Sequence, residues 1–114
     1  MTTDPTARLP ESTIYALLAH HRRRLILRIV QDFPSPLSIV ELGEILTDCE
    51  YENATDRKRQ HVLLSLYHVH LPKLTDRAVL DYDREDGTIR ADSNFGVLVG
   101  MLTDDCEEVG SFTD

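Results

Sequence analysis

The side chains best suited to chemistry are six polar residues between positions 57 and 68. They are Arg57, Lys58, Gln60, His61, Ser65 and His68. Their spacing places them on the outward face of a helix, and arginine, lysine and glutamine read base edges in a DNA major groove. Residues 53–73 contain four basic side chains and one acidic side chain, a net charge of +3, whereas the whole chain carries −8. This local positive charge predicts contact with the phosphates of double-stranded DNA.

Two other interpretations of the same helix remain open. Glu50, Glu52 and Asp56 lie beside the bases and could neutralise them, which would leave an ordinary solvated face. Leu64 lies among the polar positions and could instead contact a protein partner. Single exposed leucines are also common on protein surfaces.

A β-hairpin is predicted directly after this helix. Residues 78–82 and 88–91 are β-like, and the segment that joins them ends in Asp86-Gly87, a pair that suits the positive φ angles of a tight turn. Arg84 at the tip and Arg90 on the second strand could reach phosphate or the minor groove. A helix followed by a small hairpin is how winged helix-turn-helix domains present their last helix and wing.

The elements that would position these residues are mostly helical. A first helix is expected from Ser12 or Thr13 to Phe33, with a possible break at His20-His21. A capping box, Ser38 with Glu41, starts a second helix through residue 47. The third helix should begin at residue 53 or 55 and end near residue 70, because Pro72 follows. A last turn over residues 73–77 leads into the hairpin.

A final helix is expected over residues 95–101. The fold class is therefore mainly α with a small β-hairpin (α+β), a winged helix-turn-helix in the order α-α-α-β-β-α. Residues 12–102 form the domain, between a flexible tail at 1–11 and an acidic tail at 103–114.

Two further groups of residues suggest contacts outside the third helix. Arg22 and Arg23, within a run of three arginines, could meet the DNA backbone or a dimer partner, or simply form salt bridges within the fold. The final helix is a candidate dimer interface or, equally, a cover for the core of one chain. Its apolar residues are Phe95, Val97, Leu98, Val99, Met101 and Leu102.

Enzymatic and metal chemistry find little support. The chain has no glycine-rich phosphate loop and no nucleophile elbow, so no catalytic residue and no cofactor is expected. His68 and His70 diverge by about 200° on a helix, and His61 lies about 10 Å from His68 along the axis. No metal site is predicted, and His70 is expected to be a hydrogen-bonded core residue near the helix end.

The bulk composition limits where the protein acts. No apolar run approaches the roughly 20 residues that cross a bilayer, and no signal peptide is recognisable. Cys49 and Cys106 are far apart in the chain, which is typical of unpaired thiols in a cytoplasmic protein. Only Lys58 and Lys73 are lysines, and acids outnumber bases 20 to 12. Excess carboxylate suits a cytoplasm of molar salt, although an ordinary acidic protein has the same pattern.

The chain resembles a family of small haloarchaeal domains of unassigned function, which are predicted to be winged helix-turn-helix domains related to ArsR-type transcriptional regulators. The resemblance rests on Tyr15-x-Leu17-Leu18 with the three arginines, on Leu42, and on the run from Leu66 to Leu74. It covers residues 12–102 and implies a transcriptional regulator that acts as a homodimer. No metal-sensing cysteine motif is present, and Ala78-Val79 stands where many such regulators have a glycine.

The sequence therefore predicts a cytoplasmic DNA-binding regulator from a halophile. The third helix would enter the major groove, and the hairpin would touch the backbone. No membrane partner and no small-molecule ligand is evident. The alternative is a winged-helix protein–protein interaction module that does not bind DNA.

Overall fold

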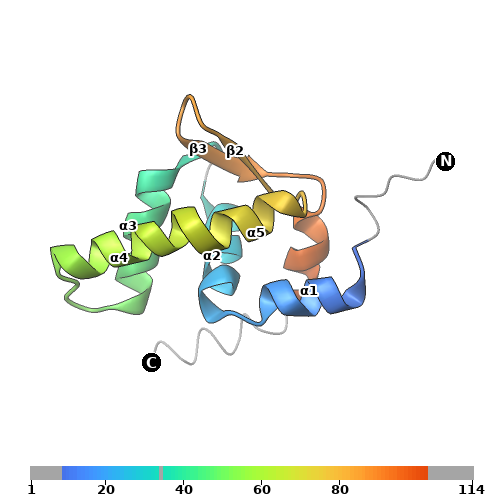
Figure 1. Ribbon diagram of the computed structural model, residues 1–114, viewed down its shortest axis with the longest axis horizontal. Helices are drawn as coiled ribbons and strands as arrows, with labels where there is room; N and C mark the ends of the chain where they lie inside the picture. The colour runs from blue at the N-terminus through green and yellow to red at the C-terminus, as the bar shows by residue number, and fades with distance from the viewer. Residues whose placement is uncertain (1–8, 34, 103–114) are drawn as a thin grey trace.

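A computed structural model describes residues 9–33 and 35–102, and the fold is mainly helical with a small antiparallel sheet of three strands (Figure 1). Part of the expected N-terminal tail, the acidic tail at 103–114 and Cys106 lie outside the described residues. The elements in chain order are α1 (Glu11–Leu18), α2 (His21–Asp32), β1 (Leu37–Ser38), α3 (Ile39–Glu50), α4 (Asp56–Ser65), the π-helical turn η2 (Leu66–His70), α5 (Leu71–Asp76), β2 (Leu80–Asp83) and β3 (Thr88–Ala91). Residues 95–102 are also helical.

The expected break in the first helix is confirmed. His20 has extended backbone angles, and its ring nitrogen Nδ1 accepts a hydrogen bond from the Arg22 amide at 3.1 Å. A side chain that accepts from an amide in the first turn satisfies one of the donors that a helix start leaves without a partner. His20 therefore lies between the two helices and caps the start of α2.

The starts of the next two helices follow local capping signals. Ser38 and Glu41 form both hydrogen bonds of the predicted capping box, and α3 continues three residues beyond its expected end. Thr55 caps α4, its hydroxyl accepting from the Lys58 amide at 3.2 Å. Both starts depend on residues within three positions of each other, which is why the sequence alone predicted them.

The expected end of the third helix near residue 70 is wrong, because α4, η2 and α5 run on from Asp56 to Asp76. Proline lacks an amide donor, and in a regular α-helix its ring meets the carbonyl four residues earlier. The wider turn η2 ends at His70, two residues before Pro72, and its last bond runs from the Leu71 amide to the Leu66 carbonyl. The helix thus accommodates the proline without ending, and α4, η2 and α5 are called the long helical run below.

The sheet contains a strand that the sequence did not predict. Its order is β1-β3-β2, with Leu37 opposite Ile89 and Tyr82 opposite Ile89 on the other side. The Ile39 amide also donates to the Gly87 carbonyl at 2.8 Å. The expected order α-α-α-β-β-α therefore omits β1, which has only two residues and no periodicity of its own.

The hairpin itself is confirmed, with Gly87 at φ +68° in its turn. The turn that leads into it has an alanine in the left-handed region, Ala78 at φ +57°. The Ala78 amide donates to the Thr75 carbonyl and the Val79 amide to the Leu74 carbonyl. These are the two bonds of a Schellman motif, whose left-handed position is usually glycine. The end of α5 therefore has the Schellman geometry that usually requires glycine, but alanine occupies the left-handed position.

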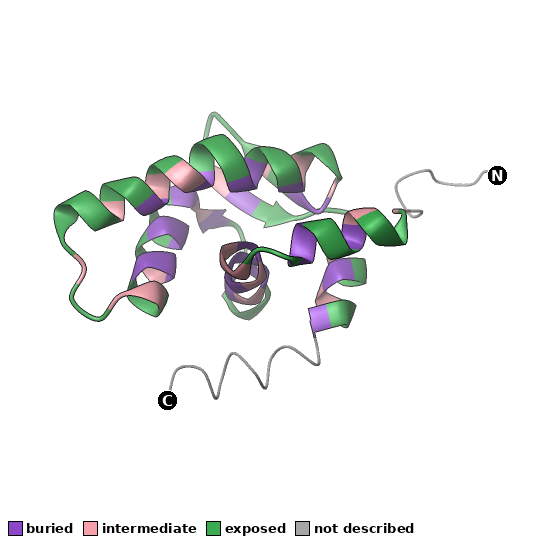
Figure 2. Cartoon of the chain, turned by 60° about the horizontal axis from the view of Figure 1, so that its bottom comes forward, coloured by how far each residue is buried: buried purple, intermediate pink, exposed green. Residues whose placement is uncertain are grey.

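The core lies between α1, α2, α3, the long helical run, the helix over residues 95–102 and the inner face of the sheet (Figure 2). Leu98 and Leu102 are 0% and 1% exposed, so they belong to the core of this chain and are not available to a dimer partner. Phe95 and Val99 are half-buried, and Met101 is exposed. None of the helices in the described part of the chain has the length and apolar character that crossing a bilayer requires.

Candidate nucleic-acid interface

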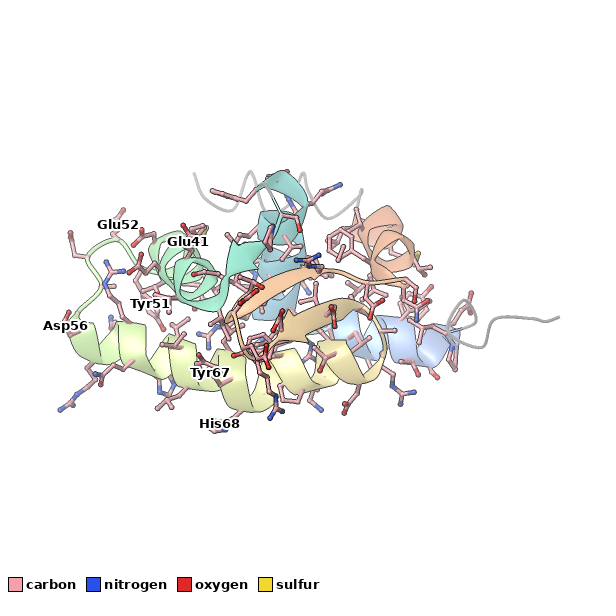
Figure 3. The ribbon with its side chains drawn as sticks, turned by 90° about the horizontal axis from the view of Figure 1, so that it is seen from above. Glu41, Tyr51, Glu52, Asp56, Tyr67 and His68 are labelled. Carbon is pink, nitrogen blue, oxygen red and sulfur yellow. The ribbon has the colours of Figure 1, made fainter. Side chains whose placement is uncertain are left out.

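The outward face of the long helical run carries most of the predicted DNA-binding side chains. Arg57, Gln60, His61 and His68 are exposed, whereas Val62 on the opposite side is 0% exposed. Figure 3 shows His68 pointing outward from this helix. Burial of the apolar side holds the polar side toward solvent.

The three cations at the start of α4 have different surroundings. Lys58 places its Nζ 4.5 Å from the centre of the Tyr51 ring, an attractive cation–π arrangement. Arg59 donates to Asp48 at 3.3 Å in an exposed pair. Arg57 forms no salt bridge with any residue that the structure describes. Of these three cations, Arg57 is therefore the one most available to a DNA phosphate or to the edge of a nucleobase.

Ser65 does not belong to this face. Its hydroxyl accepts from Arg22 Nη1 at 2.9 Å. Each step of four residues turns an α-helix by about 40° beyond a full turn. Ser65 is two such steps after Arg57, so its side chain points about 80° away from that of Arg57. The same arithmetic places Leu64 within about 20° of Arg57, and Leu64 is 56% exposed.

Arg22 is engaged within the chain and is not free to meet DNA or a partner. Its Nε and Nη2 donate to the two carboxylate oxygens of Glu50 at 2.7 and 2.6 Å. The hydrogen bonds to Glu50 raise the pKa of Arg22 above its ordinary value, and burial opposes them in part. The salt bridge within the fold, one of the alternatives given for Arg22, is thus confirmed. It forms a junction between α2, α3 and α4 in place of a contact to DNA or to a second subunit.

Arg23 is buried, so the contact expected for it is also wrong. Its Nε and Nη2 donate to the carbonyls of Leu17 and Ala16 at 2.7 and 3.0 Å, at the negative end of the α1 dipole. Its Nη1 lies 3.3 Å from His70 Nδ1. Burial lowers the pKa of Arg23. Arg23 holds the corner between α1 and α2.

His70 is a hydrogen-bonded core residue, as predicted. It is 1% exposed, and its ring meets that of His20 edge to face at 4.6 Å. Burial lowers the pKa of His70 to about 4, with further lowering by His20 and Arg23. Among the residues that the structure describes, no three histidine, cysteine, aspartate or glutamate side chains are grouped to hold a metal ion.

The hairpin and the long helical run meet at a cavity of about 500 Å³. His68 from the helix and Arg84 from the hairpin tip both line it, so the fold brings these two predicted residues together. Tyr67 and Tyr82 also line it, with ring centres 6.4 Å apart at 69°. Sequence reasoning missed these tyrosines, although Tyr82 follows the buried Leu80 by two positions and therefore lies on the same face of β2.

The hairpin is less basic than the helix. Residues 80–91 hold the two bases Arg84 and Arg90 and four acids, a net charge of −2. Arg90 is exposed and lies opposite Asp81 in the strand register. Positive charge is thus concentrated on the helix, and the hairpin offers single arginines at defined positions.

These features define a mainly helical α+β domain with a three-stranded antiparallel sheet. The chain belongs to the family described as "Domain of unknown function (DUF7344)", whose model matches residues 15–90. The match extends from α1 to the last strand of the hairpin. No curated protein and no solved structure matches the chain.

Proposed function

We propose that this protein is a winged helix-turn-helix transcriptional regulator that binds double-stranded DNA as a homodimer. The order of elements supports this proposal. A short strand precedes α3, α4 is the next helix after α3, and a hairpin supplies the other two strands of the sheet. In such domains the second helix of the pair lies in the major groove. The excess of acids, and the resemblance noted above, extend the proposal to a halophilic archaeon, a relation to ArsR-type regulators and a cytoplasmic location.

The observation that carries the proposal is the outward face of α4 and η2. Arg57, Gln60 and His61 occupy the first turns of the long helical run, where a recognition helix contacts base edges. His68 follows two turns later, beside Arg84 of the hairpin. One duplex could therefore meet the helix through its bases and the hairpin through its backbone.

The test is DNA binding over a range of salt concentrations. DNA from upstream of the protein's own gene and a shuffled duplex of equal length are titrated in about 0.2 to 1 M KCl, a range in which non-specific binding fades steeply. We expect the upstream DNA to bind more tightly throughout. An Arg57→Ala/His61→Ala variant should lose at least tenfold in affinity, about 1.4 kcal/mol.

The matched control is Lys73→Gln/Arg77→Gln, because it removes two cations at the far end of the long helical run, about 24 Å away by helix rise. It should bind the upstream DNA with an affinity within threefold of the wild type. Equal losses in both variants, or equal binding of both duplexes, would reduce the interaction to non-specific phosphate attraction and contradict the proposal.

A protein-interaction module is the second candidate, and Leu64 favours it. This leucine is 56% exposed on the same face as Arg57. A DNA reader should lose more affinity from Arg57→Ala/His61→Ala than from Leu64→Ala, whereas an interaction module should depend mainly on Leu64. Absence of DNA binding by the folded wild type would instead support the module.

A further inference from the structure

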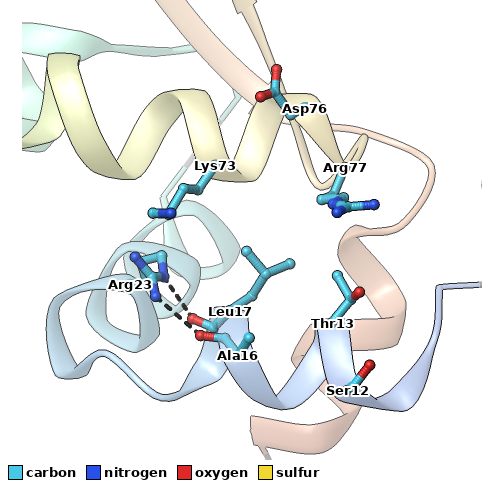
Figure 4. A pocket seen from close by; sticks show the side chains of 8 residues that line it. All are labelled: Ser12, Thr13, Ala16, Leu17, Arg23, Lys73, Asp76 and Arg77. Carbon is cyan, nitrogen blue, oxygen red and sulfur yellow. Dashed lines mark hydrogen bonds between the residues drawn. The ribbon is translucent and has the colours of Figure 1, made fainter.

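A groove between α1 and α5 collects positive charge at the end of the long helical run remote from Arg57. Its volume is about 460 Å³. The polar residues that line it are Ser12, Thr13, Arg23, Lys73, Asp76 and Arg77 (Figure 4). They come from three helices and from positions up to 65 residues apart in the chain, so no local motif indicates the groove.

Two of its cations are suitably placed for a ligand. Lys73 and Arg77 are four residues apart, which places them on one side of the end of α5, and both are exposed. Neither forms a salt bridge within the described part of the chain. The carboxylate of Asp76 points away from α1, whereas Lys73 and Arg77 lie over the groove (Figure 4). The groove is therefore positive inside a chain of net charge −8.

The third cation, Arg23, is a fixed charge in the wall. It is 7% exposed and held by the Leu17 carbonyl, the Ala16 carbonyl and His70. These contacts use three of the five N–H donors that a guanidinium has, and none of the three partners is a carboxylate. The positive charge of Arg23 is thus kept at the groove without neutralisation by an acid.

We propose that this groove binds the phosphate group of a small molecule. Lys73 and Arg77 would contact the phosphate oxygens, Arg23 would supply a fixed positive charge, and the hydroxyls of Ser12 and Thr13 would donate further hydrogen bonds. Arginine and lysine together with hydroxyl donors match the charge and the several acceptor oxygens of a phosphate. The inference is independent of DNA binding, because it involves none of the proposed DNA-contacting residues.

The test is a titration of the full chain with inorganic phosphate and with pyrophosphate, followed by amide NMR at constant ionic strength in KCl. We expect saturable shifts confined to residues 12–23 and 73–77. Lys73→Gln/Arg77→Gln should weaken binding at least tenfold, and Thr13→Val should weaken it severalfold. The matched control Arg57→Gln/Lys58→Gln removes the same charge from the other end of the helical run and should bind as the wild type does.

Three results would overturn the proposal. Shifts that are not saturable, or an equal loss in the two double variants, would mean general ionic attraction. No shift in the groove of a protein whose spectrum is that of the folded chain would exclude binding. A duplex DNA arm identifies the source of the phosphate: groove shifts with DNA but not with either free anion would assign the groove to the DNA backbone.

Discussion

Arg22 and Glu50 form a two-point ion pair that joins α2 to the end of α3, with donor–acceptor distances of 2.7 and 2.6 Å. The side chains are only 13% and 11% exposed, and Arg22 also donates to Ser65 of α4. Three helices therefore meet at one guanidinium. The α3–α4 pair that we propose to dock on DNA is held to the rest of the domain at this point.

Loss of Arg22 should strongly destabilise the fold. Arg22→Met leaves the Glu50 carboxylate buried without its partner, and removal of one member of a buried pair costs about 3 kcal/mol or more. The measurement is the free energy of unfolding from urea titrations. Arg59→Met is the control, since it breaks an exposed pair with Asp48 and should cost about 0.5 kcal/mol or less. Similar losses in the two variants would contradict a special role for the Arg22–Glu50 junction.

Ala78→Gly should stabilise the protein. Ala78 has a φ of +57°, a region that costs a residue with a Cβ roughly 1 to 2 kcal/mol and costs glycine almost nothing. We expect a gain of about 1 kcal/mol, seen as a higher urea midpoint with an unchanged slope. Ala78→Val should lower the midpoint, because a β-branched residue tolerates this conformation poorly. A glycine variant less stable than the wild type would show that another property of Ala78 dominates.

The stability of the fold should fall as the pH drops below about 6.5. His70 has a folded-state pKa of about 4 against an ordinary value near 6.5, so at intermediate pH the unfolded chain binds a proton that the folded chain does not. The contribution of neutral His70 to the free energy of unfolding is therefore fully present above pH 6.5, and it is lost as the pH falls toward 4. Between pH 7.5 and 5 the loss should be about 2 kcal/mol.

The comparison of wild type with His70→Gln isolates this effect in urea titrations at the two pH values. The variant should keep only the smaller dependence that comes from His20, whose pKa is also lowered, mainly by burial. An unchanged pH dependence in His70→Gln would assign the effect to other groups.

The proposed homodimer should depend on the exposed side of the last helix. Val97 and Met101 are 40% and 42% exposed, and Val97→Glu/Met101→Glu should convert a dimer to a monomer in sedimentation without unfolding it. Val40→Glu, at another exposed apolar position, is the control and should remain dimeric. A monomeric wild type at the concentrations that bind DNA would contradict the dimer.

The parts of the fold that the sequence predicted are those encoded over a few residues. The capping box of Ser38 and Glu41, the cap at Thr55 and the Asp86-Gly87 turn each involve neighbours in the chain. Strand β1 escaped prediction because its two residues become a strand only by pairing with β3, about 50 positions later.

The residues of the candidate site also differ in how far their positions could be predicted from neighbours in the chain. Arg57, His61 and His68 are exposed as helical periodicity predicts. The roles of Arg22, Arg23 and Ser65 depend on partners from other elements, which periodicity does not identify. A run of arginines suggests a surface for an external ligand, whereas these side chains bind a carboxylate and backbone carbonyls within the fold.

The pairing of β1 with β3 sets how the hairpin can respond to a partner. The Gly87 carbonyl accepts from the Ile39 amide at the start of α3, so the tip of the hairpin is tied to the helix pair and does not swing as a separate arm. A ligand that fits both surfaces finds them preorganised and loses little conformational entropy on binding. A ligand that requires a different distance between the hairpin and the helix pair must first break the pairing of β1 with β3. The fold therefore favours ligands whose shape matches the existing arrangement.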